Sequence, residues 1–261
     1  MQIWRLLEPE THDAFMNMAV DESILKNRIE NSVPNTVRLY CWKPSAVSIG
    51  RFQDAEKEVH VEDCTKNSVD IVRRITGGGA VYHDSDGEIT YSIVIKRADL
   101  GTDDIGEVYA KIYSGLTEAL KTLGIGADFN PGDVKACPNL TVNKRKISGS
   151  AQAHRKGVVL QHGTLLSRLD LVRMFTFLRV PWAKTCMQVA KIAESRITSI
   201  DDEAGRNIST NEIVDALVQG FEKTFKVRLE AGRLTSKELE VADHLRREKY
   251  AVEKWNLSGH N

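Results

Sequence analysis

Apolar residues recur at the three- and four-residue spacing of a helix face in several stretches of this chain. In residues 12–29 the shared face carries Phe15, Met18, Ala19, Leu25 and Ile29. Glu22 falls among these apolar positions, so we expect its carboxylate either to be buried and hydrogen-bonded or to reach a functional site. Residues 104–123 show the same helical spacing and end before Gly124.

Between residues 36 and 100 the pattern changes to that of strands. β-Branched and aromatic residues dominate 36–42 and 45–50, and Lys43-Pro44 and Gly50 give turn signals. From Ile89 to Ile95 apolar and more polar positions alternate with a period of two, which is typical of an antiparallel strand. We predict that residues 71–96 form a hairpin-like meander.

The second half repeats this mixture of strands and helices. A loop rich in Gly, Pro, Asp and Asn covers 126–139, and strands are expected in 140–154 and 158–169. The last third is mostly helical: Ser209 and Glu212 have the spacing of a capping box, and another helix is expected over 236–249. Helices and antiparallel strands in one chain predict an α+β or mixed α/β fold. We expect a single domain over 1–261, with a helical C-terminal segment over 205–261.

Composition narrows the possible classes of partner. The chain has 261 residues, of which 41% are hydrophobic and 28% charged, as in folded globular proteins. Its 36 Lys and Arg balance its 36 Asp and Glu, so no overall basic field exists to bind nucleic acid or an anionic membrane. No apolar run approaches the ~18 residues of a membrane span, and Glu8 and Glu10 lie where a signal peptide is apolar. We expect a cytoplasmic protein.

The four cysteines are Cys41, Cys64, Cys137 and Cys186. They form no C-x-x-C pair, which argues against a zinc ribbon, and they are too few for a disulfide scaffold in a chain of this length. Reduced thiols are therefore expected, with Cys41 and Cys64 as small core residues.

A glycine triplet, Gly77–Gly79, follows Arg73 and Arg74. Such a triplet is costly in a strand unless a ligand approaches the bare backbone, whose N–H groups can hold an anion. An arginine could add charge for a phosphate or carboxylate, and because strand side chains alternate, only one of the two is expected to face the ligand. The alternative is a flexible turn beside incidental arginines. Neither a Walker A loop nor a G-x-G-x-x-G motif is present.

Two further polar segments interrupt apolar strands. Lys146 ends a cationic run and leads into small residues, so it could contact a phosphoryl group as a point charge, with Ser148 on the same strand face. The alternative is a solvated strand edge. His162 lies within the apolar run 158–166 and is either a buried, hydrogen-bonded histidine or part of a site wall. No G-x-S-x-G or H-E-x-x-H motif occurs.

Together these segments resemble the lipoate–protein ligase A family. The matching stretches occur in the family's order and approximate spacing, and they are NMAVDE at 17–22, GRFQ at 50–53, RRITGGGAVYHD at 73–84, KISGSA at 146–151, HGTLL at 162–166 and SRITS at 195–199. The ending at 249–256 is similar to that of the small archaeal-type catalytic subunits, which lack the C-terminal accessory domain. Octanoyltransferases and biotin–protein ligases are the wider relatives.

The resemblance implies a fold and an activity. The fold is a class II aminoacyl-tRNA synthetase/biotin–lipoate protein ligase-like catalytic domain, a mixed sheet flanked by helices. The activity is an ATP-dependent ligation in which lipoate becomes lipoyl-AMP, with release of pyrophosphate, before transfer to a lysine. A carboxylate is a poor electrophile until it is adenylated, and bringing it to the α-phosphate requires local cations.

The resemblance also implies roles for particular residues. Lys146 would be the catalytic cation that bridges the phosphate and the lipoyl carbonyl oxygen. ATP and lipoyl-AMP would be held by Arg74 and by the backbone of Gly79, Ala80, Val81 and Tyr82. The lipoate site would comprise Gly77, Gly78, His83, Ser150, Ala151 and His162. We name Asp84 as a secondary candidate.

The implied cofactors and partners follow from that chemistry. ATP and Mg²⁺ are expected, with the metal bound mainly through phosphate oxygens and water. Acceptors would be lipoyl domains of 2-oxoacid dehydrogenase complexes or the glycine-cleavage H protein, and a separate accessory subunit is expected to assist. The loops at 126–139 and 181–194 are expected to cover the adenylate. Family ligases carry an Asn-Asp pair where this chain has Pro138-Asn139, so Asp133 is the candidate metal ligand.

Two other functions stay open at this point. In a cysteine-dependent octanoyltransferase, Cys137 would be the nucleophile, with Lys135 or Lys146 lowering its thiol pKa, and no ATP would be used. Alternatively, the Pro138-Asn139 replacement indicates a non-catalytic acyl- or nucleotide-binding protein on the same scaffold.

Overall fold

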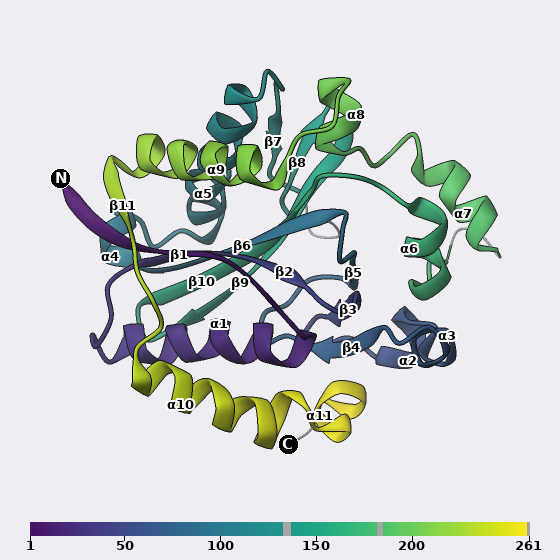
Figure 1. The fold of residues 1–261 in the computed structure, drawn as a ribbon, viewed down its shortest axis with the longest axis horizontal. Coiled ribbons are helices and arrows are strands. Elements are labelled where there is room, and N and C mark those ends of the chain that lie inside the picture. Colours follow the sequence, from purple (N-terminus) through teal and green to yellow (C-terminus); the bar gives the residue numbers. More distant parts are fainter. Residues whose placement is uncertain (133–136, 182–184, 260–261) are drawn as a thin grey trace.

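A large twisted sheet runs through the molecule and separates two layers of helices (Figure 1). The computed structural model describes residues 1–132, 137–181 and 185–259, and the statements below concern these residues. Within them the main sheet has eight strands, in the spatial order β11 (Val227–Ala231), β1 (Gln2–His12), β2 (Thr36–Trp42), β6 (Glu88–Lys96), β10 (Val158–Leu166), β9 (Arg145–Arg155), β8 (Asn139–Val142) and β7 (Asp128–Asn130). Strand β1 pairs in parallel with β11 and β2, and the other pairs are antiparallel.

Two long helices cover one face of this sheet: α5 (Ile105–Thr122) and α9 (Thr210–Phe225). They pack unusually closely, because a Cβ atom added to Gly220 would lie 2.3 Å from the carbonyl oxygen of Gly115. The capping box predicted from Ser209 and Glu212 is present at the start of α9. This face contains the largest apolar core of the described chain.

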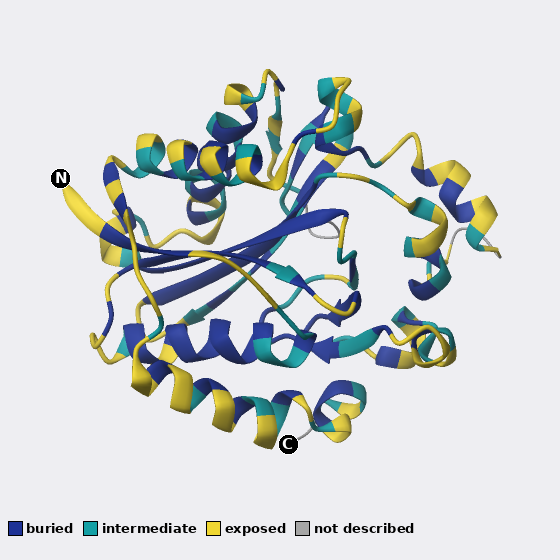
Figure 2. Cartoon of the chain, viewed as in Figure 1, coloured by how far each residue is buried: buried dark blue, intermediate teal, exposed yellow. Residues whose placement is uncertain are grey.

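The opposite face is covered by α1 (Ala14–Ile29), which is buried along most of its length, as Figure 2 shows. Outside α1 lie α10 (Ser236–Leu245), a π-helical turn at Arg246–Tyr250 and α11 (Glu253–Ser258). The expected burial of Glu22 is confirmed: its Oε2 atom accepts hydrogen bonds from Lys249 Nζ at 2.7 Å and from Tyr250 Oη at 2.6 Å. These contacts tie the C-terminal segment to α1.

A second, three-stranded sheet lies beside the main one, in the order β4 (Asp70–Arg73), β3 (Ala46–Ile49) and β5 (Val81–His83). Short helices pack against it and form a third apolar core, namely α2 (Ala55–Glu58), α3 (Val61–Lys66), α6 (Leu171–Phe177) and α7 (Cys186–Ala193). The remaining short helices are α4 (Arg97–Leu100) and α8 (Ile200–Ala204).

The expectation of a meander over 71–96 is wrong. Strands β4 and β5 pair with β3, whereas β6 pairs with β2 and β10 in the centre of the main sheet. Alternation of side chains tells which residues share a face, but it does not identify the neighbouring strand. The glycine-rich loop at 74–80 therefore connects two strands of the small sheet, which places it where the two sheets meet.

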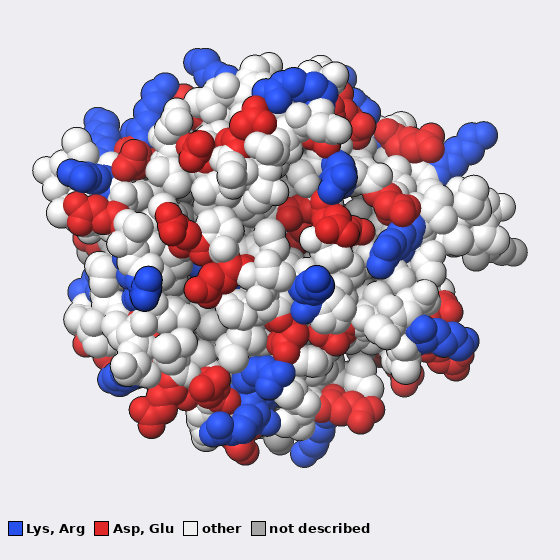
Figure 3. All heavy atoms as spheres, in the orientation of Figure 1, with Lys and Arg blue, Asp and Glu red and all other residues white. Residues whose placement is uncertain are grey.

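The predicted α+β architecture, a mixed sheet flanked by helices, is confirmed. On the face shown in Figure 3, acidic and basic side chains are interspersed, with no extended field of one sign. Among the described residues, no helix combines the length and the apolar character that crossing a membrane requires.

Candidate active site

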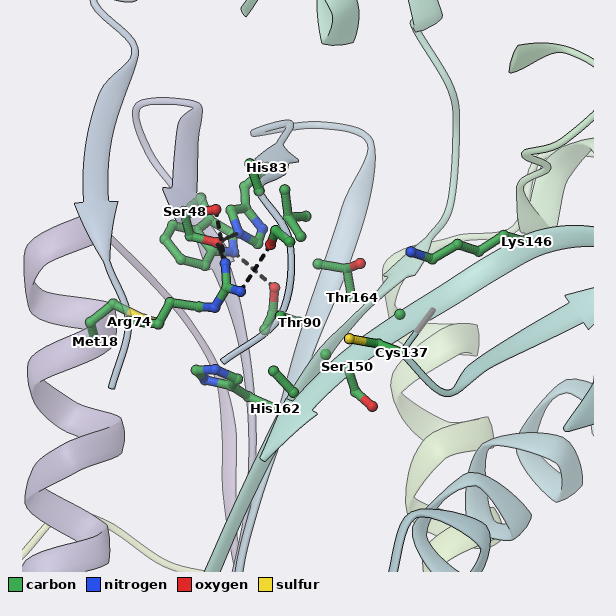
Figure 4. Close-up of a pocket in the computed structure, with 18 of the residues that line it drawn as sticks. Met18, Ser48, Arg74, His83, Thr90, Cys137, Lys146, Ser150, His162 and Thr164 are labelled. Carbon is green, nitrogen blue, oxygen red and sulfur yellow. Dashed lines mark hydrogen bonds between the residues drawn. The ribbon is translucent and has the colours of Figure 1, made fainter. Parts of the chain in front are cut away.

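A cavity of about 100 Å³ lies between the two sheets, beneath the glycine-rich loop (Figure 4). Its walls come from α1, both sheets and the segment before β8. Many of its lining residues are ones that the sequence predicts for the site, namely Arg74, Gly78, Gly79, Ala80, Val81, His83, Cys137, Lys146, Ser150, Ala151 and His162. The others are not predicted from the sequence as site residues, namely Met18, Tyr40, Trp42, Ser48, Thr90, Pro138, Gly149, Gly163 and Thr164.

Three of the selected residues, Gly77, Tyr82 and Asp84, are not part of the cavity lining. The Tyr82 ring instead stacks on Phe177 with ring centroids 5.3 Å apart, and its hydroxyl donates to Asp84 Oδ2 at 3.2 Å. Asp133 and Lys135 lie outside the described residues, as do parts of the two loops expected to act as lids. Within the described ranges, no group of three or more His, Cys, Asp or Glu side chains is arranged to hold a metal ion.

The Arg74 side chain is buried in the cavity wall, and all five of its N–H groups donate to neighbouring protein atoms. Nε donates to Thr76 Oγ1 at 3.3 Å, and Nη1 donates to the carbonyl oxygen and to Oγ of Ser48 at 2.8 and 2.7 Å. Nη2 donates to the carbonyl oxygens of Gly77 and Gly79 at 2.9 and 3.0 Å. Burial lowers the pKa of Arg74 to about 10. With these bonds in place, Arg74 has no N–H group free for a phosphate.

Arg73 points the other way and binds the C-terminal segment, so only one of the two arginines reaches the cavity. Its side chain donates to six main-chain carbonyl oxygens, which belong to Gly50, Arg51, Gln53, Trp255, Asn256 and Leu257. Trp255 Nε1 donates in return to the Arg73 carbonyl oxygen at 2.9 Å. Arg73 therefore joins the C-terminal segment to the chain that leads into the glycine-rich loop.

Both histidines in the cavity wall are buried between a carboxylate and a hydroxyl. His162 has Nδ1 2.8 Å from Asp21 Oδ2 and Nε2 2.8 Å from Thr76 Oγ1. Burial lowers the pKa of His162 and outweighs the opposing effect of Asp21, so the ring is neutral at pH 7. Burial alone would raise the pKa of Asp21, but hydrogen bonds and charge from His162 and Arg38 lower it.

Lys146 and Cys137 lie on the side of the cavity away from Arg74 (Figure 4). The Lys146 side chain as a whole is exposed, and its ammonium group forms no hydrogen bond with the described residues. Burial of the ammonium group lowers the pKa of Lys146; the Cys137 sulfur opposes this shift, and Arg74 reinforces it. Cys137 is exposed, in contrast to the buried Cys64.

A β-bulge decides where the Lys146 ammonium lies. The register between β8 and β9 shifts after Leu140, so Thr141 faces Lys146 whereas Leu140 faces Ser148. A Cβ atom on Gly149 would lie 2.7 Å from Lys146 Nζ, so the Lys146 side chain occupies the space above Gly149. The predicted partner on its face, Ser148, is instead fully buried. Strict alternation could not foresee this, because a bulge breaks it.

Tyr113 of α5 supports the segment that carries Cys137. Its hydroxyl donates to the carbonyl oxygen of Pro138 at 3.1 Å and accepts a hydrogen bond from Ser150 Oγ at 2.8 Å. Burial raises the pKa of Tyr113 well above its usual value, so it stays protonated and able to donate. The residue that follows Cys137 is thereby fixed to the sheet.

Comparison with known proteins identifies the family. The model of the lipoyl protein ligase A/B catalytic domain matches residues 13–222. The chain belongs to this family. The curated relatives include octanoyltransferase LipM of Brevibacillus brevis, which is 36% identical, with 98% of this chain and 99% of the relative covered. LipM of Kyrpidia tusciae is 38% identical, with the same shares of the two chains covered.

The solved structures of this family include proteins described as ligases. One belongs to a bi-partite lipoate protein ligase from the archaeon Thermoplasma acidophilum, with a TM-score of 0.85, 31% identity, and 100% of this chain and 98% of that chain covered. Another is a lipoate-protein ligase A bound with ATP, with a TM-score of 0.85, 30% identity and all of both chains covered. The resemblance found in the sequence is therefore confirmed.

The main expectation about activity, an ATP-dependent lipoate ligase, is wrong. Curated relatives that cover 98% of this chain are named octanoyltransferases, including the LipM proteins of Bacillus subtilis and Clostridioides difficile at 31% and 33% identity. Most of the motifs used to infer a ligase shape the pocket and the loop around it. The chain is an enzyme of the ligase/octanoyltransferase family.

Proposed function

We propose that this enzyme is a cysteine-dependent octanoyltransferase. It would take an octanoyl group from the thioester of an acyl carrier protein and pass it to a lysine of a lipoyl domain or of the glycine-cleavage H protein. The observation that carries this proposal is the placement in one pocket of an exposed thiol, Cys137, and the ammonium group of Lys146, which pairs with none of the described residues. The full-length match to octanoyltransferases supports it.

In the first half-reaction, Cys137 Sγ attacks the carbonyl carbon of the carrier thioester. Lys146 is suited to receive the thiol proton, because burial lowers its pKa and so increases the fraction present as the free amine. The bond between the carbonyl carbon and the carrier sulfur then breaks. Lys146 returns the proton to the departing thiolate, and the octanoyl group is left as a thioester on Cys137.

In the second half-reaction, the amine of the acceptor lysine attacks the same carbonyl carbon. The bond to Cys137 Sγ breaks, an amide forms, and the proton lost by the amine passes through Lys146 to the Cys137 thiolate. The thioester supplies the activated acyl group, so this sequence needs neither ATP nor Mg²⁺. The arrangement of Arg74, whose N–H groups are all used by protein acceptors, agrees with a reaction that binds no phosphate at this position.

The apolar part of the cavity suits an alkyl chain. Met18 and Trp42 contribute to its lining, and the backbone of Gly78 and Gly79 borders it without side chains. The N–H groups of these two glycines donate to no acceptor within the described part of the chain. They are therefore available to a carbonyl oxygen on which negative charge develops.

The proposal predicts a covalent intermediate on one cysteine. Incubation with octanoyl acyl carrier protein should add one octanoyl group to the enzyme, as seen by intact-protein mass spectrometry. An apo lipoyl domain added afterwards should receive that group. Cys137→Ser should abolish both steps, whereas the matched control Cys186→Ser, on α7, should retain them.

Two outcomes would contradict the proposal. One is octanoyl transfer that survives Cys137→Ser. The other is lipoylation that requires ATP and releases AMP, which would restore the ligase. Binding of octanoate without any transfer would favour the non-catalytic alternative. One neighbour in structure belongs to a bi-partite ligase, and the need for an accessory subunit here stays a prediction, tested by repeating the assay with that subunit added.

A further inference from the structure

Arg74 is a buried cation, and no carboxylate of the described residues is in contact with it. Its acceptors are hydroxyl and carbonyl oxygens from Ser48, Thr76, Gly77 and Gly79, and only 5% of the residue is exposed. A buried charge is costly unless nearby groups compensate for it. The mechanism proposed above gives Arg74 no step. Its presence in the pocket wall therefore needs a separate explanation.

Two hydrogen-bonded chains connect this guanidinium to carboxylates further away. In the first, Thr76 Oγ1 lies 2.8 Å from His162 Nε2, and His162 Nδ1 lies 2.8 Å from Asp21 Oδ2. In the second, Ser48 Oγ lies 2.7 Å from His83 Nε2, and His83 Nδ1 lies 2.7 Å from Glu88 Oε1. The members come from α1, β3, β5, β6, β10 and the glycine-rich loop, and all of them are buried.

With both imidazole rings in the neutral form, the chemistry of the groups fixes the direction of every bond. A guanidinium can only donate, so Ser48 Oγ and Thr76 Oγ1 must accept from Arg74. Each hydroxyl hydrogen then points at an imidazole Nε2, which accepts it in the neutral ring. The remaining Nδ1–H donates to the carboxylate. Both chains thus run in one direction, from the positive charge to a negative charge, and each bond polarises the next.

Arg74 links the two hydrogen-bonded chains to the glycine-rich loop. One nitrogen, Nη2, holds the carbonyl oxygens of both Gly77 and Gly79. Between them, Gly78 has a φ of +88°, a conformation that other residues avoid. The loop also packs tightly on its base, since a Cβ on Gly50 would lie 2.1 Å from the Gly78 carbonyl oxygen. A guanidinium that could rotate would release both carbonyl groups together.

We propose that the chains Asp21–His162–Thr76 and Glu88–His83–Ser48 are positioning devices that fix the Arg74 guanidinium and, through it, the loop that forms the roof of the acyl pocket. His83 and His162 then act on Arg74 and take no proton from substrate. The effect on transfer rests on the proposed octanoyltransferase activity, whereas the effect on the loop does not.

The first test measures the loop without any substrate. Thr76→Val and Ser48→Ala each remove one hydroxyl from a chain, and Thr76→Ser keeps the hydroxyl and serves as the matched control. Amide hydrogen exchange across residues 77–80 should speed up in Thr76→Val and Ser48→Ala and stay near the wild-type rate in Thr76→Ser. The segment around Tyr113 and Ser150 should exchange as in the wild type in all three variants.

The second test measures the chemistry. The rate at which octanoyl acyl carrier protein acylates the enzyme should fall about tenfold in Thr76→Val and in Ser48→Ala, less than the ~10²-fold that a misplacement of about 1 Å can cost. In an Arg74→Met background, the same two substitutions should cause no further loss, because they act through the side chain already removed. Thr76→Ser, which keeps the hydroxyl, should acylate at nearly the wild-type rate.

Several results would overturn the proposal. One is unchanged exchange at 77–80 in both hydroxyl-deleting variants. Another is an equal loss of rate with and without Arg74, which would mean that the chains act elsewhere. If Arg74→Met does not fold, the exchange measurements on Thr76→Val and Thr76→Ser decide alone. An inactive wild-type enzyme with the expected exchange pattern would refute the transferase and leave the positioning chains standing.

Discussion

Two walls of the cavity between the sheets, one around Arg74 and one around Lys146 and Cys137, are built in opposite ways. On the wall of Arg74, every donor of the guanidinium has an acceptor, and the side chains around it are buried and joined in two chains. On the wall of Lys146 and Cys137, the ammonium forms no hydrogen bond with described residues, and the thiol is exposed. The guanidinium of one wall has all its donors hydrogen-bonded, whereas the reactive groups of the other wall have no hydrogen-bond partner in the described part of the chain.

This difference suggests a division of labour. A group whose hydrogen bonds are all made helps to hold the structure together, and changing it should affect the free energy of unfolding more than the rate. A group without partners contributes little to stability, and changing it should alter the rate first. The four predictions below test that division, from the largest expected effect to the smallest.

Lys146→Met should lower the rate of octanoyl transfer about 10³-fold, within the range usual for the loss of a proton-transferring group. Its free energy of unfolding should change by less than about 0.5 kcal/mol, because the side chain is exposed and makes no bond to described residues. Single-turnover acylation and urea denaturation measure the two quantities. Lys144→Met, in the preceding turn, is the control, and full activity in Lys146→Met would remove its assigned role.

Asp21→Asn should lower the free energy of unfolding by about 3 kcal/mol, since breaking a buried ion pair leaves an uncompensated charge. Asp21 binds Arg38 at 2.8 Å and accepts from Tyr40 Oη at 3.0 Å in addition to its contact with His162. Urea denaturation measures the change. The exposed Asp54, which pairs with Lys57 and accepts from the Glu56 N–H of the short helix that it caps, gives the control Asp54→Asn, which should have almost no effect. A loss of rate without a loss of stability in Asp21→Asn would contradict the proposed difference between the two walls.

Gly149→Ala should lower the acylation rate about tenfold, which corresponds to about 1.4 kcal/mol in the barrier. The new methyl group would occupy the place where Lys146 Cε and Nζ now lie, 2.7 Å from the built Cβ. Stability should change little, because the end of a flexible side chain can move aside. Wild-type activity in this variant would show that the exact position of the ammonium is unimportant.

As the pH is lowered, the wall of Arg74 should be destabilised at a higher pH than the wall of Lys146. The pKa of His162 is lowered by burial in the folded enzyme, so below about pH 6.5 the unfolded chain binds a proton that the folded chain excludes. The free energy of unfolding therefore falls as pH decreases, by at most about 1.4 kcal/mol per pH unit for this group. Urea denaturation between pH 7.5 and about 5.5 should show a smaller slope in His162→Gln than in the wild type. Equal slopes would exclude this histidine as the source.

Structural features that depend on residues close together in the sequence could be predicted, whereas features that depend on contacts between distant segments could not. Helix α1 and helix α5 were predicted well, because their side-chain periodicity is a local property. The strand expected over 140–154 is instead two strands, β8 and β9, with Asn143 and Lys144 between them at positive φ. Thr90 was missed as a lining residue, although its place on the more polar face of β6 was a usable signal. Ser48 gave no such signal, because it reaches the cavity only through the pairing of β3 with β4 and β5.

The activity was harder to predict than the fold for a chemical reason. A ligase and a transferase of this family both need a pocket for an acyl chain, a loop of bare backbone and a lysine nearby, so the motifs at 73–84 and 146–151 fit both. The feature that separates the two proposals is one thiol, Cys137, in the loop before β8. Strand alternation correctly predicted that one of Arg73 and Arg74 would face the site, but it could not choose between them.

The six carbonyl groups around Arg73 have a consequence for the end of the chain. Half of them belong to Trp255, Asn256 and Leu257, which follow Arg73 in the sequence by 182, 183 and 184 positions. The other half belong to the stretch on which the Gly78 carbonyl rests. Removing the residues after Tyr250 would therefore deprive the buried Arg73 guanidinium of three acceptors. The expected effect is a loosening of the glycine-rich loop at 74–80, which is remote in sequence from the truncation.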